Sequence, residues 1–538
     1  MAKHVINQGF RAGEMTPKLD GQVEFDKYFE GCKQLENFVP TIQGPAERRS
    51  GFRYIATTKD STKECRLIPF DFSTEQAYIL EFGNLYIRFY KNRGQIVKTT
   101  ASNWVTATSY VVGDYVTQSA IIYYCLTAHT SGTFATDLAA GKWVAQTIYE
   151  IPTTYTEAEL PELQFTQSAD ILFIVHPNHY PAKLSRTGHT AWTLTDIPFT
   201  KRYYPTASLL TTSGFDNFKA IDCVDNNIAT KAWDNNTDPV GEWLLLNATS
   251  PREIVKIALY VANADLNVEF NVQYSTDNVT FYNAYTGWIL AGEGMGWHEV
   301  EWDSVGAKKY WRLYKNNAAI SGGDVMEVQF FEAGKPSAWT AGKYPSSITF
   351  YEDRLWFAYL QTIWGSKSGD YYNFSFGTDD DEAMEYTILS QQVNKIQWLS
   401  AGRVLCIGTA EGVYKASASS LGEGMTPLNI TIVKEVSFKG AGYMEAIPID
   451  NVVLYLSRSK RKIREFTYSA GDDGFVAADM TILSEHLFTI NDTVTSMAYQ
   501  PEPYSCLWCV RDDGVLLGFS YQRLEKVLAW HRHITDGL

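Results

Sequence analysis

A strand-rich unit repeats through the last third of the chain. Each copy reads as an apolar strand, a polar turn, a second apolar strand, another turn and a third strand, as in "SSITFYEDRLWFAYLQTIWGSK". Equivalent starts fall at Ile348, Ile396, Ile447 and Val494, so successive copies begin 48, 51 and 47 residues apart. This spacing is typical of propeller blades, and a lone meander has a face that it can bury only against a neighbour. The repeat therefore predicts a β-propeller-type body.

The rest of the composition agrees with a mostly β protein. At 538 residues the chain is too long for one core, and its 33 Tyr, 28 Phe and 15 Trp favour strands. Related meanders occur at 66–97 and 163–186. Two segments interrupt the rhythm and predict modules inserted in loops, a small β module at 102–146 and a longer one at 205–335.

These features divide the chain into six predicted parts. They are an N-terminal arm, helix and docking loop (1–60), propeller strands (61–101), the small insertion (102–146), further propeller strands (147–204), the second insertion (205–335) and propeller blades (336–538). The helix is expected within 25–35, where Phe25, Tyr28, Phe29, Cys32 and Leu35 follow a helical period.

Three arginines follow that helix in "QGPAERRSGFRYIA". Arg48, Arg49 and Arg53 lie within six positions of a chain whose formal net charge is −15. Such an acidic balance argues against a protein that coats nucleic acid, but it permits a wall past which DNA slides. The arginines are a solvated turn or a docking loop for carboxylates of a partner, and docking is the favoured interpretation.

A second basic cluster and an acidic run each allow two interpretations. The cluster at Arg458, Lys460, Arg461 and Lys462 is an exposed hairpin or a docking site for an acidic partner. The run Asp379, Asp380, Asp381 and Glu382 is a solvated turn or an acidic rim that faces DNA. Consecutive carboxylates suit a glycosidase pair poorly, because such a pair needs a fixed separation across a cleft.

Catalytic and metal-binding patterns are weak. The nine histidines are dispersed, and we find no nucleophile elbow, zinc-protease motif or phosphate-binding glycine loop. His176 and His179 in "VHPNHYP" flank a site or mark a Pro-rich strand end, and the strand end is the favoured interpretation. The seven cysteines indicate reduced thiols, and the spacing of Cys506 and Cys509 suits chelation poorly on a strand. We expect no catalytic residue, metal or cofactor. The start has no apolar signal-peptide region, and no apolar run is long enough to span a membrane, so a soluble protein is expected.

Aromatic residues of the insertions are candidate glycan contacts. Trp104, Tyr110, Tyr124 and Trp143, with Tyr123, offer stacking faces for sugars or form the core of the small module. Trp233 begins a polar "WDNN" loop that is a ligand site or a capped turn.

Several segments together resemble a known family. The segments "GEMTPKLDGQVEFDKYFEGCKQLENFVPTIQGPAERRSGFRYIA", "RLIPFDFSTEQAYILEFGNLYIRFY", "SADILFIVHPNHYPAKLSRTGHTAW", "LWFAYLQTIWGSKSGDYYNF" and "CVRDDGVLLGFSYQRLEKVLAWHRH" resemble, in order, tail nozzle (tail tubular or stabilisation) proteins of short-tailed bacteriophages. The 102–146 insertion, with "SYVVGDYV" and "AGKW", resembles a chitin-binding-type module. The 205–335 insertion resembles a discoidin-type jelly roll, in which Trp233, Trp243 and Trp311 match framework positions.

The resemblance implies a structural virion protein that is assembled in the host cytoplasm. It implies a homohexameric ring below the portal and adaptor, with a channel that retains and ejects genomic DNA without binding it specifically. The last blade is expected to be incomplete or closed by other segments. The alternative is a host-surface glycan-binding adhesin or a polysaccharide-processing propeller enzyme, in which the insertions bind sugar.

Overall fold

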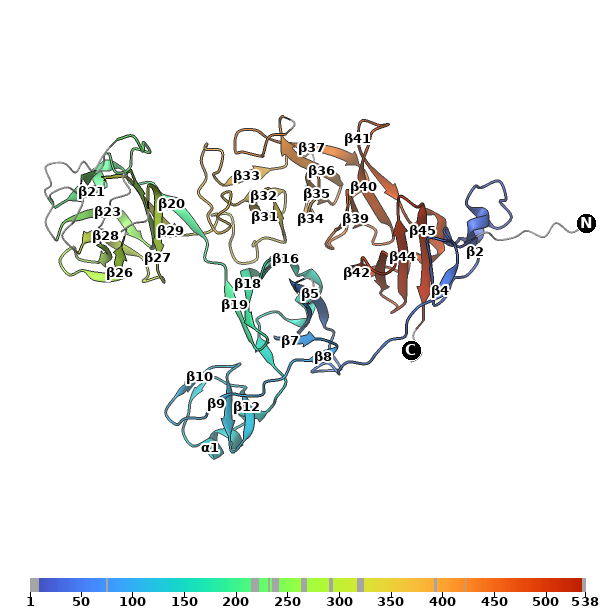
Figure 1. The fold of residues 1–538 in the computed structure, drawn as a ribbon, viewed down its shortest axis with the longest axis horizontal. Coiled ribbons are helices and arrows are strands. Elements are labelled where there is room, and N and C mark those ends of the chain that lie inside the picture. Colours follow the sequence, from blue (N-terminus) through green and yellow to red (C-terminus); the bar gives the residue numbers. More distant parts are fainter. Residues whose placement is uncertain are drawn as a thin grey trace, which may run out of the picture.

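The structure, a computed structural model, describes residues 9–73, 76–213, 222–230, 233–234, 241–262, 269–289, 294–316, 324–390, 394–420 and 422–534. The described chain is mostly β, and its body is of the β-propeller type (Figure 1). Six antiparallel meander sheets, here called blades 1 to 6, follow one another along an arc.

Each blade is built from consecutive short strands. Blade 1 comprises β5 (Arg66–Ser73), β6 (Gln76–Gly83), β7 (Tyr86–Lys91), β8 (Gly94–Gln95) and β15 (Glu150–Pro152). Blade 2 comprises β16 (Gln164–Ser168), β17 (Ile171–His176), β18 (His179–Gly188) and β19 (Ala191–Asp196). Blade 3 comprises β30 (Ser347–Tyr351), β31 (Arg354–Tyr359), β32 (Thr362–Gly365) and β33 (Met384–Thr387).

The last three blades follow without interruption. Blade 4 comprises β34 (Ile396–Ala401), β35 (Leu405–Thr409), β36 (Gly412–Ala418) and β37 (Ile430–Ser437). Blade 5 comprises β38 (Ile447–Ile449), β39 (Val452–Leu456), β40 (Ile463–Ser469) and β41 (Gly474–Asp479). Blade 6 comprises β42 (Val494–Gln500), β43 (Cys506–Arg511), β44 (Leu516–Gln522) and β45 (Val527–His533). The four repeat starts read from the sequence all lie in the first strands of blades 3 to 6, which confirms that period.

The cores of the body lie between neighbouring blades. One apolar cluster joins each pair along the arc, from blades 1 and 2 to blades 5 and 6. Trp356 and Trp398 are fully buried in two of these clusters. Within the described residues, no such cluster joins blade 6 to blade 1, and residues 49–65 cross between those blades without a strand (Figure 1).

The N-terminal arm completes blade 6. Strand β1 (Gly13–Glu14) pairs in parallel with β45 and with β2 (Gly31–Cys32), while β3 (Phe38–Pro40) and β4 (Ala46–Arg48) form a hairpin beside it. A side chain at Gly13 would meet the backbone of Trp530 at 2.5 Å, and its φ of +69° also favours glycine. The last blade is thus closed by the start of the chain, which is one of the two outcomes expected.

The predicted N-terminal helix is wrong. In place of an α-helix over 25–35, the structure has one 3₁₀ turn, η2 (Tyr28–Glu30), followed directly by β2, and another 3₁₀ turn, η1 (Pro17–Leu19), lies before this segment. Gly31 is extended, and a side chain there would collide with that of Met15 at 1.9 Å. Pairing of β2 with β1 overrides the helical spacing of the aromatic residues, because edge pairing satisfies the backbone of this segment.

The small module carries the strands β9 (Ser102–Asn103), β10 (Ser109–Tyr110), β11 (Tyr115–Gln118), β12 (Ile121–Cys125), β13 (His129–Thr130) and β14 (Trp143–Ala145) and one short helix, α1 (Phe134–Ala139). It leaves the body between β8 and β15 of blade 1 and projects away from the blades (Figure 1).

The second module is a two-sheet sandwich of jelly-roll type between blades 2 and 3. One sheet contains β20 (Thr200–Tyr203), β29 (Asp324–Ala333), β24 (Ile254–Val261) and β27 (Gly296–Glu301), with β22 (Trp233–Asp234) on β29. The other contains β21 (Leu210–Thr212), β23 (Trp243–Arg252), β28 (Lys308–Lys315), β25 (Glu269–Ser275) and β26 (Tyr282–Ile289). Trp311 and Phe270 are fully buried between them. In the part of the chain that the structure describes, no helix is long and apolar enough to cross a membrane.

Candidate functional sites

The three N-terminal arginines divide into two groups. Arg49 is half-buried and bonds within the chain, donating from Nε to Asn37 Oδ1 at 3.3 Å and from Nη2 to the carbonyl of Ile534 at 3.3 Å. Arg48 and Arg53 are exposed. Of the three arginines, only Arg48 and Arg53 therefore remain candidates for docking. Arg49 instead holds the segment to the end of blade 6.

The segment 51–55, which includes Arg53, forms no helix or strand and exposes large apolar side chains. Phe52 is 65% exposed and Tyr54 is 74% exposed, although both are large aromatic side chains. The Arg49 guanidinium lies 4.2 Å from the ring centre of Phe52. Exposed aromatic residues next to free arginines are typical of protein-binding surfaces.

The second basic cluster lies on the turn between β39 and β40. Arg458 and Lys460 are exposed, and Arg461 is half-buried. Lys462 instead pairs with Asp479 on β41, with Nζ to Oδ2 at 2.5 Å. Arg458, Lys460 and Arg461 therefore remain candidates for docking, whereas Lys462 pairs within blade 5.

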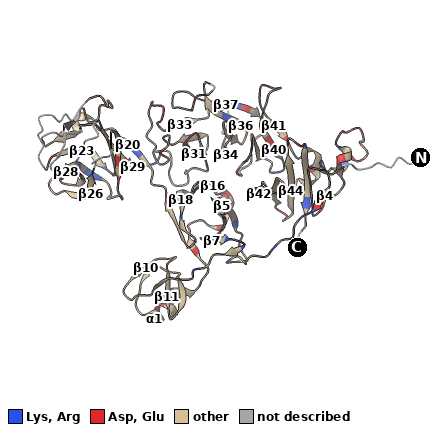
Figure 2. Ribbon diagram, in the orientation of Figure 1, with Lys and Arg blue, Asp and Glu red and all other residues tan. Residues whose placement is uncertain are grey.

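The acidic run forms a turn before β33. Its carbonyls hold the buried guanidinium of Arg354, which donates from Nη2 to Asp380 at 2.7 Å and from Nη1 to Glu382 at 2.6 Å. Asp379, Asp380 and Asp381 are exposed, but Glu382 is buried and accepts a bond from the hydroxyl of Tyr204 at 3.2 Å. Because it is buried and bonded, Glu382 is a structural residue rather than part of an exposed rim. Acidic and basic residues are interspersed over the blades and both modules (Figure 2).

The aromatic residues of the small module form its core. Tyr110, Tyr124 and Trp143 are 9%, 3% and 3% exposed, so none presents a face to a sugar, which corrects their assignment as glycan contacts. Trp104 is half-buried and packs edge-to-face on Phe134, with ring centres 5.7 Å apart. A small module without disulfides needs such rings to build a core. The side chain of Trp233 lies outside the described residues.

Sequence patterns missed an aromatic and amide cluster on the sandwich. Arg312 of β28 lies over the ring of Phe281 at 3.7 Å and near that of Tyr314 at 4.9 Å. Its Nε donates to Gln273 Oε1 at 2.6 Å, and Gln273 Nε2 donates to Asn283 Oδ1 at 2.8 Å. Only strand register brings these residues together, since they come from three separate strands or turns.

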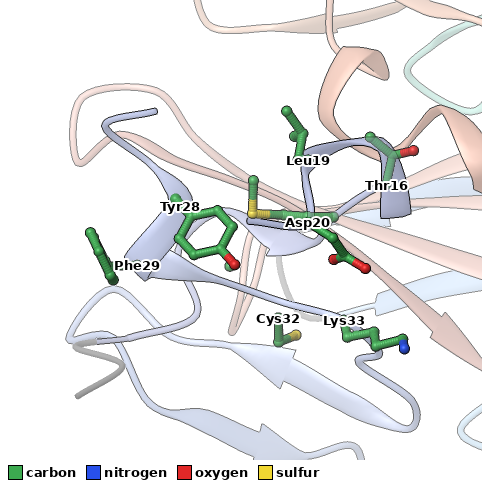
Figure 3. Close-up of a pocket in the computed structure, with 9 residues that line it drawn as sticks. Thr16, Leu19, Asp20, Tyr28, Phe29, Cys32 and Lys33 are labelled. Carbon is green, nitrogen blue, oxygen red and sulfur yellow. The ribbon is translucent and has the colours of Figure 1, made fainter. Parts of the chain in front are cut away.

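Cysteine chemistry finds no support in the described chain. Cys506 and Cys509 are both buried in β43, and burial raises the pKa of the Cys506 thiol to about 12. Cys32 lines a pocket of about 210 Å³ on the N-terminal arm, together with Met15, Leu19 and Tyr28 (Figure 3). Burial, and next the charge of Glu14, raise the pKa of Cys32 to about 11. These thiols are protonated at neutral pH and poor nucleophiles.

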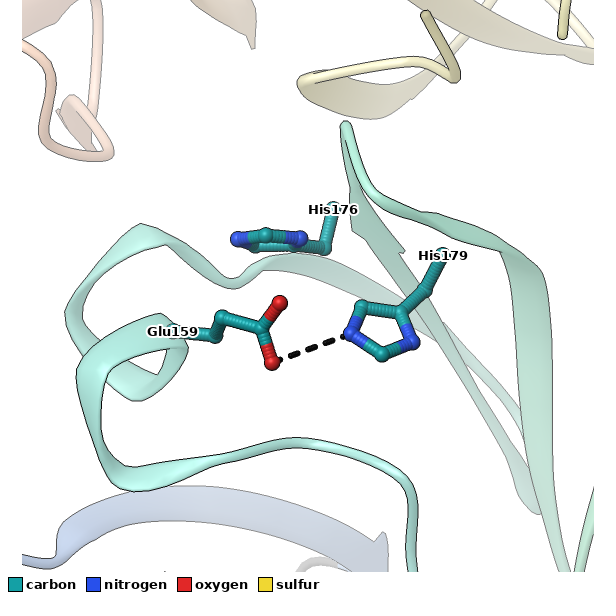
Figure 4. A group of neighbouring side chains, drawn as sticks. All are labelled: Glu159, His176 and His179. Atoms are coloured by element: carbon teal, nitrogen blue, oxygen red, sulfur yellow. Dashed lines mark ion pairs between the residues drawn. The ribbon is translucent and has the colours of Figure 1, made fainter. Parts of the chain in front are cut away.

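His176 and His179 do not simply end a strand. They close the turn between β17 and β18, and both rings lie at the carboxylate of Glu159 on η3 (Glu157–Glu162) (Figure 4). His179 Nε2 is 3.0 Å from Glu159 Oε2. Burial raises the pKa of Glu159, but bonds from Thr156, His179 and Asn178 bring it down to about 2. No spacing in the sequence indicates that "EAELPE" and "HPNH" meet, because only the pairing of the strands between them places them side by side.

Comparisons with known proteins concern about a quarter of the chain. No protein-family model matches, and no curated protein matches. The solved structures to which the chain is similar include a family 32 carbohydrate-binding module of AlyQ in complex with 4,5-unsaturated mannuronic acid (17% identity, 22% of this chain, 92% of that chain, TM-score 0.20). Another is a family 32 module of Clostridium perfringens NanJ in complex with galactose (17% identity, 25% of this chain, 99% of that chain, TM-score 0.21). A third is a chitosan-binding module from Paenibacillus sp. IK-5 (20% identity, 24% of this chain, 99% of that chain, TM-score 0.19).

Proposed function

We propose that the chain is a structural, non-enzymatic subunit of a phage virion, the nozzle of a short tail. The observation that carries the proposal is the segment 48–55, whose arginines Arg48 and Arg53 and whose aromatic residues Phe52 and Tyr54 are exposed beside the closed blade 6. A surface of this kind fits docking between subunits. It lies on a chain in which several segments resemble nozzle proteins in the same order along the sequence. Its partners are further copies, as a hexamer, and the adaptor or portal.

In this proposal the DNA channel runs between chains and not through one propeller. The loop before β38 crosses to blades 2 and 3, where the Tyr443 hydroxyl donates to the carbonyls of Glu162 at 2.9 Å and Ser346 at 2.8 Å. Glu445 on the same loop accepts the N–H of Phe165 at 2.6 Å. These contacts between distant blades stiffen the subunit. In this proposal the acidic channel wall therefore forms between neighbouring chains of the assembly.

Reversal of the two free arginines tests the proposal. Full-length Arg48→Glu/Arg53→Glu should remain a folded monomer by circular dichroism and fail to form rings in negative-stain images with the tail proteins of its virion. Arg93→Glu, on an exposed turn of blade 1, is the matched control and should assemble. Normal rings from the double variant, or purified virions without the chain, would exclude the nozzle assignment.

A second role, glycan binding at the host surface, is favoured by the cluster around Arg312. Guanidinium, amide and aromatic groups on one sheet are those that proteins use to hold sugar hydroxyls and stack on sugar rings. The full chain should bind a subset of a glycan array, and Arg312→Ala should lose that signal while Lys309→Ala keeps it. Equal binding by both variants would place sugar recognition elsewhere or exclude it.

A further inference from the structure

Two carboxylates and two imidazoles meet at the junction of blades 1 and 2. Glu159 and Glu162 are three residues apart on η3, and three residues make one turn of a 3₁₀ helix, so both point to one side. His176 and His179 are direct cross-strand partners around the Pro177–Asn178 turn. The backbone of both elements therefore fixes an E-x-x-E pair opposite an H-x-x-H pair.

The distances between these groups are those of a compact ligand set. One ligand atom from each of Glu159, His176 and His179 lies within 4.8 Å of the others (Figure 4). Glu162 Oε2 lies beside this set, 3.4 Å from His176 Nε2. The two imidazole centres are 5.3 Å apart.

The buried histidine supplies a second, independent sign of a ligand. His176 is 1% exposed, and its Nε2 atom is buried without a well-directed hydrogen bond, with Glu162 Oε2 3.4 Å away. Buried polar atoms normally have a well-directed partner, so the Nε2 atom of His176 needs an explanation.

We propose that Glu159, Glu162, His176 and His179 form a binding site for a divalent transition metal of the zinc class. Two imidazoles and two carboxylates suit Zn²⁺ or a similar cation in four-fold coordination. Ca²⁺ and Mg²⁺ prefer sets made of oxygen alone and fit less well. The cation would tie the turn after blade 1 to the central hairpin of blade 2 and so fix the two blades against each other.

Metal binding has a specific consequence for His176. Its Nδ1 accepts the N–H of Asn178 at 3.2 Å, so the neutral ring carries its proton on Nε2 when no metal is bound. A cation that binds Nε2 displaces that proton to solvent, and Nδ1 takes up a proton from solvent, so the net proton count is unchanged. The protonated Nδ1 can no longer accept the N–H of Asn178. Loading therefore shifts the tautomer of His176 and moves the Pro177–Asn178 turn.

Zinc titration of the full chain tests the site. The chain is first treated with EDTA and desalted, and metal is then added. With Zn²⁺ we expect one bound ion per chain, measured by mass spectrometry of the metal, and a raised melting temperature. With Co²⁺ we expect the absorption bands of four-fold coordination. His179→Gln and Glu162→Gln should weaken binding at least tenfold, and Glu162 is 59% exposed at its side chain, so its variant should fold.

Two variants are matched controls. Glu157→Gln lies on the same 3₁₀ helix and His298→Gln on the sandwich, and both should bind Zn²⁺ as the parent chain does. Nitrogen NMR shifts of His176 should show the tautomer change only when metal is added. Absence of stoichiometric binding, or equal binding by His179→Gln and His298→Gln, would overturn the site and leave two His–Glu ion pairs. Neither result depends on ring assembly.

Discussion

The carboxylate of Glu14, at the start of the chain, is fully buried against the guanidinium of Arg532, in the last strand. Arg532 donates from Nε to Oε2 at 3.0 Å and from Nη2 to Oε1, a two-pronged contact. The backbone N–H of Leu35 donates to the same carboxylate at 2.9 Å, and His486 Nε2 lies 2.8 Å from it. One buried anion thus joins the N-terminal arm, the η5 turn (Ile482–Leu487) and β45.

Removal of that charge should loosen blade 6. Glu14→Gln leaves Arg532 without its buried partner, and the loss of one member of such a pair costs about 3 kcal/mol. Urea denaturation followed by tryptophan fluorescence should show this as a lower midpoint. Glu24→Gln, an exposed carboxylate of the same arm, should unfold like the parent chain. If both variants unfold alike, the arm is not held by Glu14.

The sequence allows prediction of blades but not of contacts between distant segments. Period and strand alternation predict β30, β34, β38 and β42 because each meander is local. The helix over 25–35 is wrong because pairing of Gly31 with Gly13, a contact made within the sheet, decides the backbone there. His176 meets Glu159 only across a blade, so no spacing in the sequence could reveal the pair.

The core of the small module should depend on Trp143. Its ring packs 5.1 Å from that of Tyr110 and 5.5 Å from that of His129. Trp143→Ala leaves a cavity whose cost, about 3–5 kcal/mol, exceeds what a core of this size withstands. Hydrogen exchange should rise through 102–146 and stay unchanged in the blades. Val105→Ala, at an exposed position, is the control and should leave the exchange rates unchanged. If the amides of 102–146 stay protected in Trp143→Ala, the core assignment is wrong.

The thiols of β43 should resist alkylation in the folded chain. Cys506 and Cys509 are 1% and 0% exposed, and burial raises the pKa of both. Iodoacetamide at pH 8 should therefore modify them only after denaturation, as read by peptide mass spectrometry. Cys65, half-buried in the segment before β5, is the internal comparison and should react faster. Fast labelling of Cys509 in the native protein would mean that blade 6 opens readily.

Stability should fall as pH rises, through Glu445 in the loop that crosses from blade 5 to blade 2. Burial raises its pKa to about 7, although Arg66, 3.6 Å away, and the N–H of Phe165 act in the opposite direction. An unfolded glutamate has a pKa of about 4.3, so between about pH 4.3 and 7 the folded chain binds the extra proton. The free energy of unfolding contributed by this group is therefore highest below pH 4.3 and declines until pH 7.

Glu445→Gln keeps an acceptor for Phe165 and removes the titration. Its stability should equal that of the parent near pH 4 and exceed it at pH 8, in paired urea titrations. A parallel pH profile for the two chains would show that Glu445 is ionised in the fold.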